Sequence, residues 1–265
     1  MRLPEFFIGC DPEVFLQDAT GAYISAIGRI GGTKQDPRPL PIGNGFAVQE
    51  DNVALEFNIP PAGSANEFKE SMNKVKAYLQ HEINSMGLHF AKESATLFPY
   101  SQLLDPSALV FGCDPDYNAW TEKRNPRPRA TNKQLRSCGG HIHIGKVFNS
   151  AADQIKFIKH MDLFAGVPSV LMDNGELRKQ LYGKAGAFRP KTYGVEYRTL
   201  SNYWIFNDSL IDWAYQTVDM AIQHFDKDDI DLGEWGKRIQ TTINQNNKDM
   251  AASMVDHFGL NVVYA

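Results

Sequence analysis

The sequence predicts an α+β protein, in which an antiparallel sheet carries helices packed on one face. Two observations predict this class. Strand-like runs come in pairs around short turns in the first sixty residues, and helical runs come later in separate blocks. A strict alternation of strands and helices, which is typical of a parallel sheet, is not seen. We therefore expect hairpins that form one sheet, with helices behind it.

The first half of the chain contains two predicted hairpins and one helix. EVFLQD (13–18) and AYISAIGRI (22–30) flank a turn at residues 19–21, and FAVQEDNVALEFNIPP (46–61) folds back around Asp51 and Asn52. Ser64 and Glu67 form a capping box that begins a helix running to about residue 86. LHFAKESATLF (88–98) predicts a strand, and the polar, Pro-containing residues 114–131 predict a loop.

The second half is richer in helices. Residues 153–172 have helical periodicity that is interrupted near Gly166 and Pro168, and YGVEYRTLSNYWI (193–205) predicts a strand. An amphipathic helix follows at 208–225, with Asp208 near its start, and the tail from Glu234 onward is also helical in pattern. We expect residues 1–265 to form one domain whose part from about residue 206 is helical.

Composition excludes several classes of protein. The chain has 265 residues, of which 43% are hydrophobic and 22% charged, and this composition predicts a globular protein. Its net charge of -4 predicts no general attraction to nucleic acid or anionic membranes. No apolar run approaches the roughly 18 residues of a membrane helix, and Asp11 comes too early for a signal-peptide core. Cys10, Cys113 and Cys138 lack zinc-site spacing, so we expect reduced thiols in a cytoplasm.

The stretch CGGHIHIG (138–145) places two histidines on one face of a strand. His141 and His143 alternate with Ile142 and Ile144, and side chains two residues apart in a strand share a face. The flanking glycines leave room for something bulky near the backbone. Taken alone, such a histidine pair is a surface or structural feature about as often as it is a ligand pair.

Acidic residues fall at the same spacing in other strand-like stretches. These are Asp11 and Glu13 in GCDPEVF, Glu56 with Asn58 in VALEFNI, and Glu196 with Arg198 in GVEYRTL, with Glu50 on the neighbouring arm of the second hairpin. Singly, the first pair could be a turn and the last a surface ion pair. If the strands are neighbours, however, the acids would repel one another unless cations lie among them. Oxygen ligands with some imidazole suit Mg²⁺ or Mn²⁺.

Basic residues in the same regions are candidate phosphate ligands. They are Lys34 in GGTK, Arg178, Arg189 and Lys191 in AFRPK, and Arg198. Lys34 lies in a polar loop, where a solvated side chain is the commoner outcome. The coincidence of acid pairs, paired histidines and bases at strand spacing favours a site at which the histidines face metal and phosphate.

Five stretches, in this order, resemble the carboxylate–amine (COOH–NH2) ligase superfamily, which includes glutamine synthetase and glutamate–cysteine ligase. They are GCDPEVFLQD, VQEDNVALEFNIPPA, FGCDPDYNAW, CGGHIHIG and GVEYRTLSNYW. They are most similar to the phage-associated amidoligases of type 2, and the likeness runs from residue 10 to about 205. It implies a curved antiparallel sheet, a partial barrel of glutamine-synthetase type, with helices on its outer face.

The resemblance also implies roles for the metal ligands. Asp11 and Glu13 would each bind a different metal ion. Glu56, with Glu50 or Asp51, would complete the shell of the first ion. The chain departs from glutamine synthetase in having Asp-Pro-Glu in place of Glu-x-Glu, and because Pro12 cannot donate to a sheet, an edge or bulge is expected there. The spacing between Glu50 and Glu56 is also shorter than in that enzyme.

The remaining roles concern the second ion and the nucleotide. His141 and Glu196 would bind the second metal, His143 would lie near the nucleotide phosphates, and Arg198 would steady the transferred phosphoryl group. Glu56, Lys34, Arg189 and Arg198 are the residues we expect to act in catalysis, and His143, Arg178, Lys191 and Arg198 those we expect to bind the cofactor.

The implied activity is ATP- and Mg²⁺-dependent joining of a carboxylate to an amine through an acyl phosphate, with Mn²⁺ as an alternative ion. The substrates would be small molecules or peptides selected by loops 31–45 and 112–135, and the setting would be the host cytoplasm for a phage-encoded protein. An oligomer is possible, but nothing predicts a dodecamer. Two alternatives stay open at this point: a metallohydrolase that uses the same ligands, and a non-catalytic module that keeps the fold.

Overall fold

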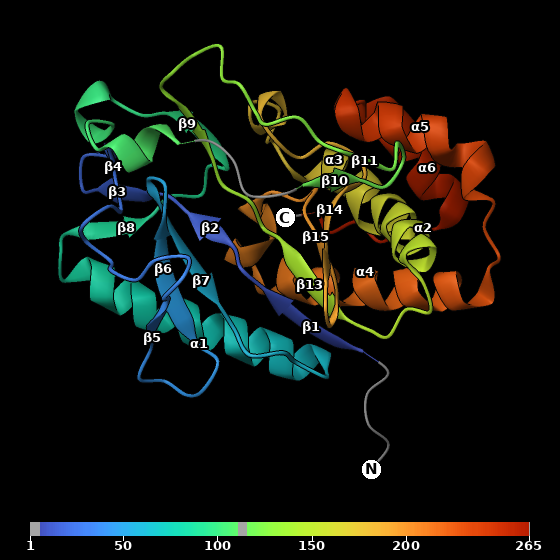
Figure 1. Cartoon of the computed structure of the whole chain (residues 1–265), viewed down its shortest axis with the longest axis horizontal. Coiled ribbons are helices and arrows are strands. Elements are labelled where there is room, and N and C mark those ends of the chain that lie inside the picture. The colour runs from blue at the N-terminus through green and yellow to red at the C-terminus, as the bar shows by residue number, and fades with distance from the viewer. Residues whose placement is uncertain (1–5, 111–115, 265) are drawn as a thin grey trace.

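The computed structural model describes residues 6–110 and 116–264, and within them it confirms the α+β class (Figure 1). The largest sheet has six strands, all paired antiparallel. In spatial order they are β1 (Phe7–Cys10), β13 (Ile142–Gly145), β15 (Gly194–Tyr197), β14 (Ala187–Lys191), β10 (Tyr117–Asn118) and β11 (Lys123–Arg124). The sequence did not predict β14, β10 or β11.

The strands form several sheets in place of the one that was predicted. A four-stranded sheet contains β2 (Glu13–Val14), β7 (Ala54–Asn58), β6 (Ala47–Asp51) and β5 (Arg38–Pro39). Smaller sheets pair β4 (Tyr23–Ile24), β3 (Leu16–Asp18) and β8 (Leu88–Phe90), and β12 (Leu135–Ser137) with β9 (Ala95–Leu97). Both hairpins are confirmed, whereas the strand expected at 88–98 is split between β8 and β9. No closed barrel occurs in the described part of the chain, and the likeness to glutamine synthetase stays a prediction.

The helices begin and end close to where the pattern placed them. They are α1 (Ala65–Asn84), α2 (Ala151–Met161), α3 (Val167–Met172), α4 (Asp208–Lys227), α5 (Leu232–Asn244) and α6 (Lys248–Phe258). The Ser64 side chain caps α1, and a π-helical turn at Asp162–Gly166 is the interruption expected between α2 and α3. No helix in these described ranges has the length and apolarity needed to cross a membrane.

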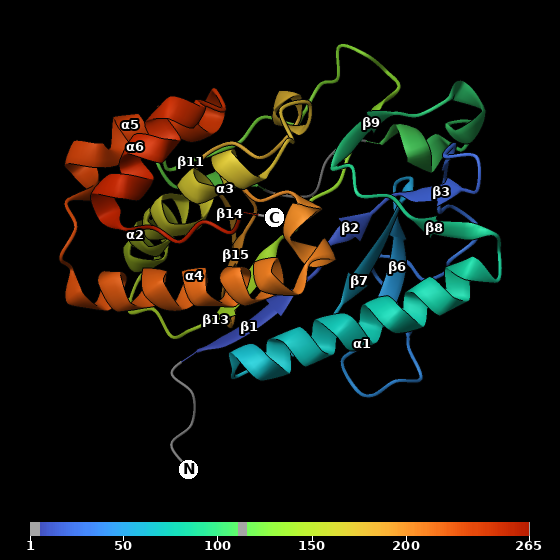
Figure 2. The same cartoon turned by 180° about the vertical axis from the view of Figure 1, so that it is seen from behind.

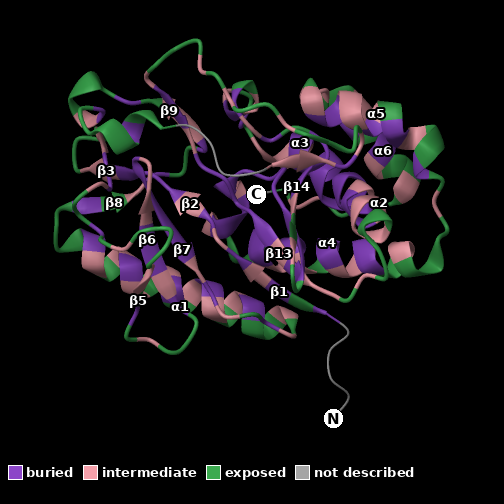
Figure 3. Cartoon of the chain, in the orientation of Figure 1, coloured by how far each residue is buried: buried purple, intermediate pink, exposed green. Residues whose placement is uncertain are grey.

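Two long helices support the sheets from behind. Figure 2 shows α1 and α4 lying across the back of the strands, α1 behind β6 and β7 and α4 behind β13 and β15. Figure 3 shows that central strands such as β7 and β13 and the inward faces of these helices are largely buried. The core includes Phe57 and Leu55 of β7, Phe68 of α1 and Trp213 of α4. Burying apolar side chains on this scale is what fixes the strands, and therefore the polar residues on their opposite faces.

The chain passes from the six-stranded to the four-stranded sheet at Asp11 and Pro12. β1 ends at Cys10 and β2 begins at Glu13, which fits the break expected at a proline that has no N–H to donate. The Asp11 N–H donates to the His141 carbonyl at 3.4 Å, and the Glu13 N–H donates to the Gly139 carbonyl at 2.9 Å. The acids at the start of the chain therefore lie directly beside the histidine segment.

The glycines before the histidines are needed for close packing within the protein. A Cβ on Gly139 would lie 2.3 Å from His141 Nε2, and a Cβ on Gly140 would lie 2.3 Å from the Ser201 carbonyl oxygen and 2.5 Å from Trp204 Nε1. The expectation that these glycines leave room for a bulky neighbour is correct at both positions. The neighbours are the protein's own side chain and backbone.

Candidate active site

One row of residues crosses four strands of the six-stranded sheet. Gly9, His143, Glu196 and Arg189 are direct cross-strand neighbours on β1, β13, β15 and β14. Cross-strand neighbours share a face, so the imidazole, the carboxylate and the guanidinium point to the same side. Gly9 has no side chain, so on this face of β1 the side chain of His143 can lie close to the backbone of Gly9.

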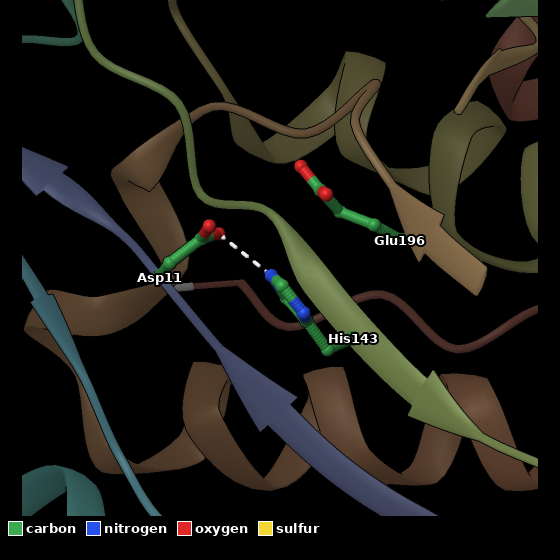
Figure 4. Close-up of side chains that lie close together, drawn as sticks. All are labelled: Asp11, His143 and Glu196. Atoms are coloured by element: carbon green, nitrogen blue, oxygen red, sulfur yellow. Dashed lines mark ion pairs between the residues drawn. The ribbon is translucent and has the colours of Figure 1, made fainter. Parts of the chain in front are cut away.

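The first candidate ligand set, which we call the histidine group, consists of Asp11, His143 and Glu196 (Figure 4). Each contributes a ligand atom, and these atoms all lie within 4.8 Å of one another. His143 Nε2 is 3.1 Å from Asp11 Oδ1. His141 is close by, because its Nδ1 lies 3.4 Å from Asp11 Oδ1 and 3.8 Å from Glu196 Oε1.

Two atoms of the histidine group are buried without a hydrogen-bond partner among the described residues. They are Asp11 Oδ1 and His143 Nε2. Their contacts are ion-pair contacts with each other and, for Asp11 Oδ1, with His141 Nδ1, so both atoms keep a lone pair or proton aimed at the same small space. A carboxylate oxygen and an imidazole nitrogen are a donor set that suits Mn²⁺ and accommodates Mg²⁺, so these residues fit a divalent cation.

The second set, which we call the acid group, consists of Glu13, Asp51 and Glu56. Glu13 and Glu56 are cross-strand neighbours on β2 and β7, and all three carboxylates have oxygens within 4.8 Å of one another. Glu56 accepts a hydrogen bond from Gln49 Nε2 at 2.9 Å, and Glu13 accepts one from the Gly139 N–H at 2.8 Å. Three carboxylates this close form an all-oxygen set of the kind that hard cations prefer.

Repulsion and burial disturb the protonation of the acid group. Burial, helped by the charge of Asp51, raises the pKa of Glu13 to about 8. Burial and the charges of Asp11, Asp51 and Glu13 raise the pKa of Glu56 well above its usual value. The protein on its own therefore does not hold three ionised carboxylates here, and a cation would remove the conflict.

Glu50, which was predicted as a ligand of the first metal, points the other way. In the β6–β7 hairpin Gln49 is opposite Glu56 and Glu50 is opposite Leu55, so Glu50 lies on the opposite face from Glu56. Its carboxylate accepts the backbone N–H groups of residues 28–31 at 2.8–3.1 Å. The prediction for Glu50 is corrected by this geometry, and the alternative, Asp51, takes its place in the acid group.

Three basic side chains surround the carboxylate of Glu196, which is fully buried. Lys191 Nζ is 2.8 Å and Arg189 Nη1 is 3.1 Å from Glu196 Oε2, and Arg198 Nη1 donates to Oε1. Burial alone would raise the pKa of Glu196, but the charge of Arg198 and the nearby histidines outweigh it and lower the pKa to about 2. Glu196 is therefore ionised, and it gathers the predicted phosphate ligands around itself.

The two histidines have different electrostatic surroundings. Burial and the charge of Arg198, whose Nη1 is 3.3 Å from His141 Nδ1, lower the pKa of His141. For His143 burial acts in the same direction, but the charge of Asp11 outweighs it and raises the pKa. The pKa of Asp11 is held well below its usual value, because the interactions with His143 and His141 exceed the effect of burial.

Two cavities open on either side of these groups. The larger, about 540 Å³, is lined by Asp11, Glu56, His143, Arg189, Lys191 and Tyr193, together with apolar Phe7, Ile59 and Pro61. The smaller, about 410 Å³, is lined by Glu13, Asp51, His141, Arg178 and Arg198, among others. Lys34 lines both. The structure thus brings Arg189 and Lys191 together but places Arg178 in the other cavity, where it donates to the Thr199 carbonyl at 3.0 Å.

Two residues of the site were missed from the sequence. Tyr193, in the turn between β14 and β15, forms a hydrogen bond with His143 Nδ1, and Asp116 Oδ1 lies 3.3 Å from Arg198 Nε. Tyr193 could have been noticed as an aromatic residue three positions before Glu196. Asp116 belongs to the FGCDPDYNAW stretch, and residues 111–115 of that stretch, with Cys113, lie outside the described residues.

Fold and site together define a class: an α+β protein in which buried carboxylates and imidazoles lie next to arginine and lysine, as at sites for divalent cations and phosphate groups. Residues 130–244 match the sequence model of the family described as "Phage phiEco32-like COOH.NH2 ligase-type 2". This match supports the family of ligases that the motifs predicted, over the segment that contains both histidines, Glu196 and Arg198. No curated protein matches the chain.

Proposed function

We propose that this protein is an ATP- and Mg²⁺-dependent ligase that joins a carboxylate to an amine through an acyl phosphate. The observation that carries the proposal is the histidine group itself. Asp11 Oδ1 and His143 Nε2 form an ion pair at 3.1 Å and have no hydrogen-bond partner among the described residues, and three bases meet at Glu196 beside them. A divalent cation and a polyanion would both find ligands in this place, and ATP with Mg²⁺ is such a pair.

The histidine group would hold one cation, and the acid group would hold another. For the cation of the histidine group, the geometry favours His143 as the imidazole ligand, whereas the resemblance implied His141. His141 is the alternative ligand, because its Nδ1 approaches the same two carboxylates. Bound Mg²⁺ or Mn²⁺ would supply positive charge to phosphoryl oxygens during transfer.

The protein's bases would bind and orient the nucleotide in the larger cavity. Arg189 and Lys191 lie two residues apart on the same face of β14 and can donate to phosphate oxygens. The apolar lining of the same cavity, formed by Phe7, Ile59 and Pro61, suits a planar base. About 540 Å³ lies within the usual range for sites of small ligands and cofactors.

The acid and the amine would enter the smaller cavity. Arg198 lines that cavity and contacts Glu196, so it lies between the phosphate-binding bases and the place of the carboxylate substrate. An oxygen of the substrate carboxylate attacks the γ-phosphorus and ADP leaves. The amine nitrogen then attacks the acyl carbon, inorganic phosphate leaves, and the amine loses a proton. Arg198 would stabilise the charge that accumulates on the transferred group.

The test is a screen of acids and amines for ADP and phosphate release with ATP and Mg²⁺. We expect release only when one acid and one amine are present together. Release of phosphate that needs no amine would indicate a hydrolase, and no ATP turnover with nucleotide still bound would indicate a non-catalytic module. Glu196→Gln is the variant to compare, because it keeps the shape of the side chain where alanine would leave three bases around a hole. Glu70→Gln, an exposed glutamate on α1, is the matched control.

A further inference from the structure

Tyr193 connects the histidine group to the larger cavity. It lies in the two-residue turn between β14 and β15, and its hydroxyl forms a hydrogen bond with His143 Nδ1. The two rings are nearly parallel, with centroids 6.0 Å apart and planes 22° apart. Tyr193 lines the larger cavity and is 48% exposed, so its hydroxyl group lies at the boundary between the partly buried imidazole of His143 and a ligand-sized space.

The position of the proton on the His143 ring decides whether His143 or Tyr193 is the donor in the hydrogen bond between them. His143 Nε2 faces Asp11 Oδ1 at 3.1 Å, within the set of ligand atoms that also includes Glu196. An imidazole that binds a cation through Nε2 uses the lone pair of that nitrogen, so its proton must be on Nδ1. Nδ1–H then donates to the Tyr193 oxygen. A phenol has one proton, and once its oxygen accepts from His143 that proton is free to point elsewhere.

We propose that Tyr193 is a positioning residue that couples the two ligands of the site. It holds His143 with Nε2 toward Asp11, and when that nitrogen is bound it turns its hydroxyl proton into the larger cavity as a donor for an anionic oxygen of the phosphate type. This inference rests on the proposed function, because it assumes a divalent cation at the histidine group.

Without the cation, and with His143 neutral, the same three residues adopt a different proton arrangement. A proton on Nε2 satisfies Asp11, and the Tyr193 hydroxyl then donates to the lone pair on Nδ1. In that state the hydroxyl has no proton to offer to the cavity. Cation binding therefore creates a hydrogen-bond donor in the larger cavity, so Tyr193 contributes to cooperative binding of the cation and the anion.

Tyr193→Phe tests this with the whole chain, because it removes the hydroxyl group and keeps the ring. Tyr100→Phe is the matched control, since Tyr100 is 64% exposed and lines neither cavity. Calorimetry measures the affinity for Mn²⁺ in the absence of other ligands, and then the affinity for pyrophosphate with and without Mn²⁺. For Tyr193→Phe we expect Mn²⁺ affinity to fall about 10-fold, as is usual when the partner of a metal-binding histidine is removed. We also expect Mn²⁺ to enhance pyrophosphate binding about 5-fold less than in the unaltered protein.

A spectroscopic readout separates this role from a general structural one. In ¹⁵N spectra of the histidine rings, the Mg²⁺-loaded unaltered protein should show His143 with its proton on Nδ1. Tyr193→Phe should weaken that preference at an unchanged melting temperature of the metal-free protein. Unaltered Mn²⁺ affinity and unaltered coupling in Tyr193→Phe would overturn the inference while leaving the ligase proposal intact. Failure of the unaltered protein to bind Mn²⁺ would overturn both, whereas cation and pyrophosphate binding without ATP turnover would overturn only the ligase proposal.

Discussion

The acid group and the histidine group lie beside each other at the junction of two sheets, but their charges are balanced in different ways. In the histidine group Glu196 is contacted by Arg189, Lys191 and Arg198, and its pKa is lowered to about 2. In the acid group burial and mutual repulsion raise the pKa of Glu13 to about 8 and that of Glu56 well above its usual value. A cation in the histidine group must therefore compete with bases for Glu196, whereas in the acid group it relieves a repulsion.

This difference predicts that Glu196→Gln has the largest effect of any single change at the site. The amide cannot balance the charges of three bases, of which Arg198 is buried, so both the orientation of those bases and the charge of a metal ligand are lost. We expect ATP turnover to fall by about 10³-fold, and the free energy of unfolding to fall by about 3 kcal/mol because partners of a buried ion pair are left uncompensated. Turnover is measured as ADP release, and stability by urea unfolding. If turnover stays within tenfold of the unaltered protein while Glu70→Gln behaves as expected, Glu196 has no such role.

Glu56→Gln is expected to separate cation binding from stability. It removes the free-energy cost, at neutral pH, of either protonating Glu56 or ionising it beside the other acids, so the metal-free protein should gain about 1 kcal/mol in its free energy of unfolding. The same change removes an oxygen charge from the proposed cation site, and Mn²⁺ affinity should fall by at least about 10-fold. Calorimetry and urea unfolding measure the two quantities. A loss of stability together with normal cation binding would contradict our description of the acid group.

Glu50→Gln is the counterpart on the opposite face of the same hairpin. Glu50 accepts four backbone N–H groups from residues 28–31, and an amide has only one oxygen with which to accept them. We expect a loss of about 2 kcal/mol in the free energy of unfolding and Mn²⁺ affinity within about twofold of the unaltered protein. Should Mn²⁺ affinity fall as far as in Glu56→Gln, the distinction between the two faces of β6 would be wrong.

The sequence predicted those parts of the site that depend on strand alternation. His143 and Glu196 face each other across β13 and β15, and each lies on the face expected from its apolar neighbours. Glu50 was wrongly predicted although the same alternation could have excluded it, because residues directly opposite each other in a hairpin share a face and Gln49 is opposite Glu56.

Other features depend on how segments without a periodic pattern fold. Arg178 begins a 3₁₀ turn at Arg178–Gln180, and no spacing rule relates it to β14, so its separation from Arg189 and Lys191 could not be predicted. The same is true of Asp116, the residue directly before β10, which contacts Arg198. The division of one predicted sheet into several follows from the break at Pro12. That break was predicted, but the direction of the chain after it depends on tertiary packing.

Asp162 is another buried carboxylate, and it lies on the opposite side of β15 from Glu196. It shows what burial does to a carboxylate whose hydrogen-bond donors carry no charge. It accepts hydrogen bonds from Trp120 Nε1 at 2.6 Å, Tyr197 Oη at 2.8 Å and Thr199 Oγ1 at 3.3 Å. These partners are uncharged, in contrast to the three bases around Glu196 on the other face of the same strand. Burial therefore dominates and raises the pKa of Asp162 to about 7, even though each donor acts to lower it.

The sign of the resulting pH dependence follows from proton uptake in the two states. Between about pH 4 and pH 7 the unfolded chain has lost the Asp162 proton while the folded protein keeps it, so stability falls as pH rises through this window and levels off above pH 7. Asp162→Asn cannot titrate, so the stability of the unaltered protein relative to this variant should fall by about 2 kcal/mol between pH 5 and pH 7. Urea unfolding of both proteins across this range measures the difference, and contributions from the acid group cancel because both proteins contain it. A difference that stays constant with pH would mean that Asp162 is ionised throughout, and that neutral donors alone stabilise a buried carboxylate in this fold as well as the three bases do for Glu196.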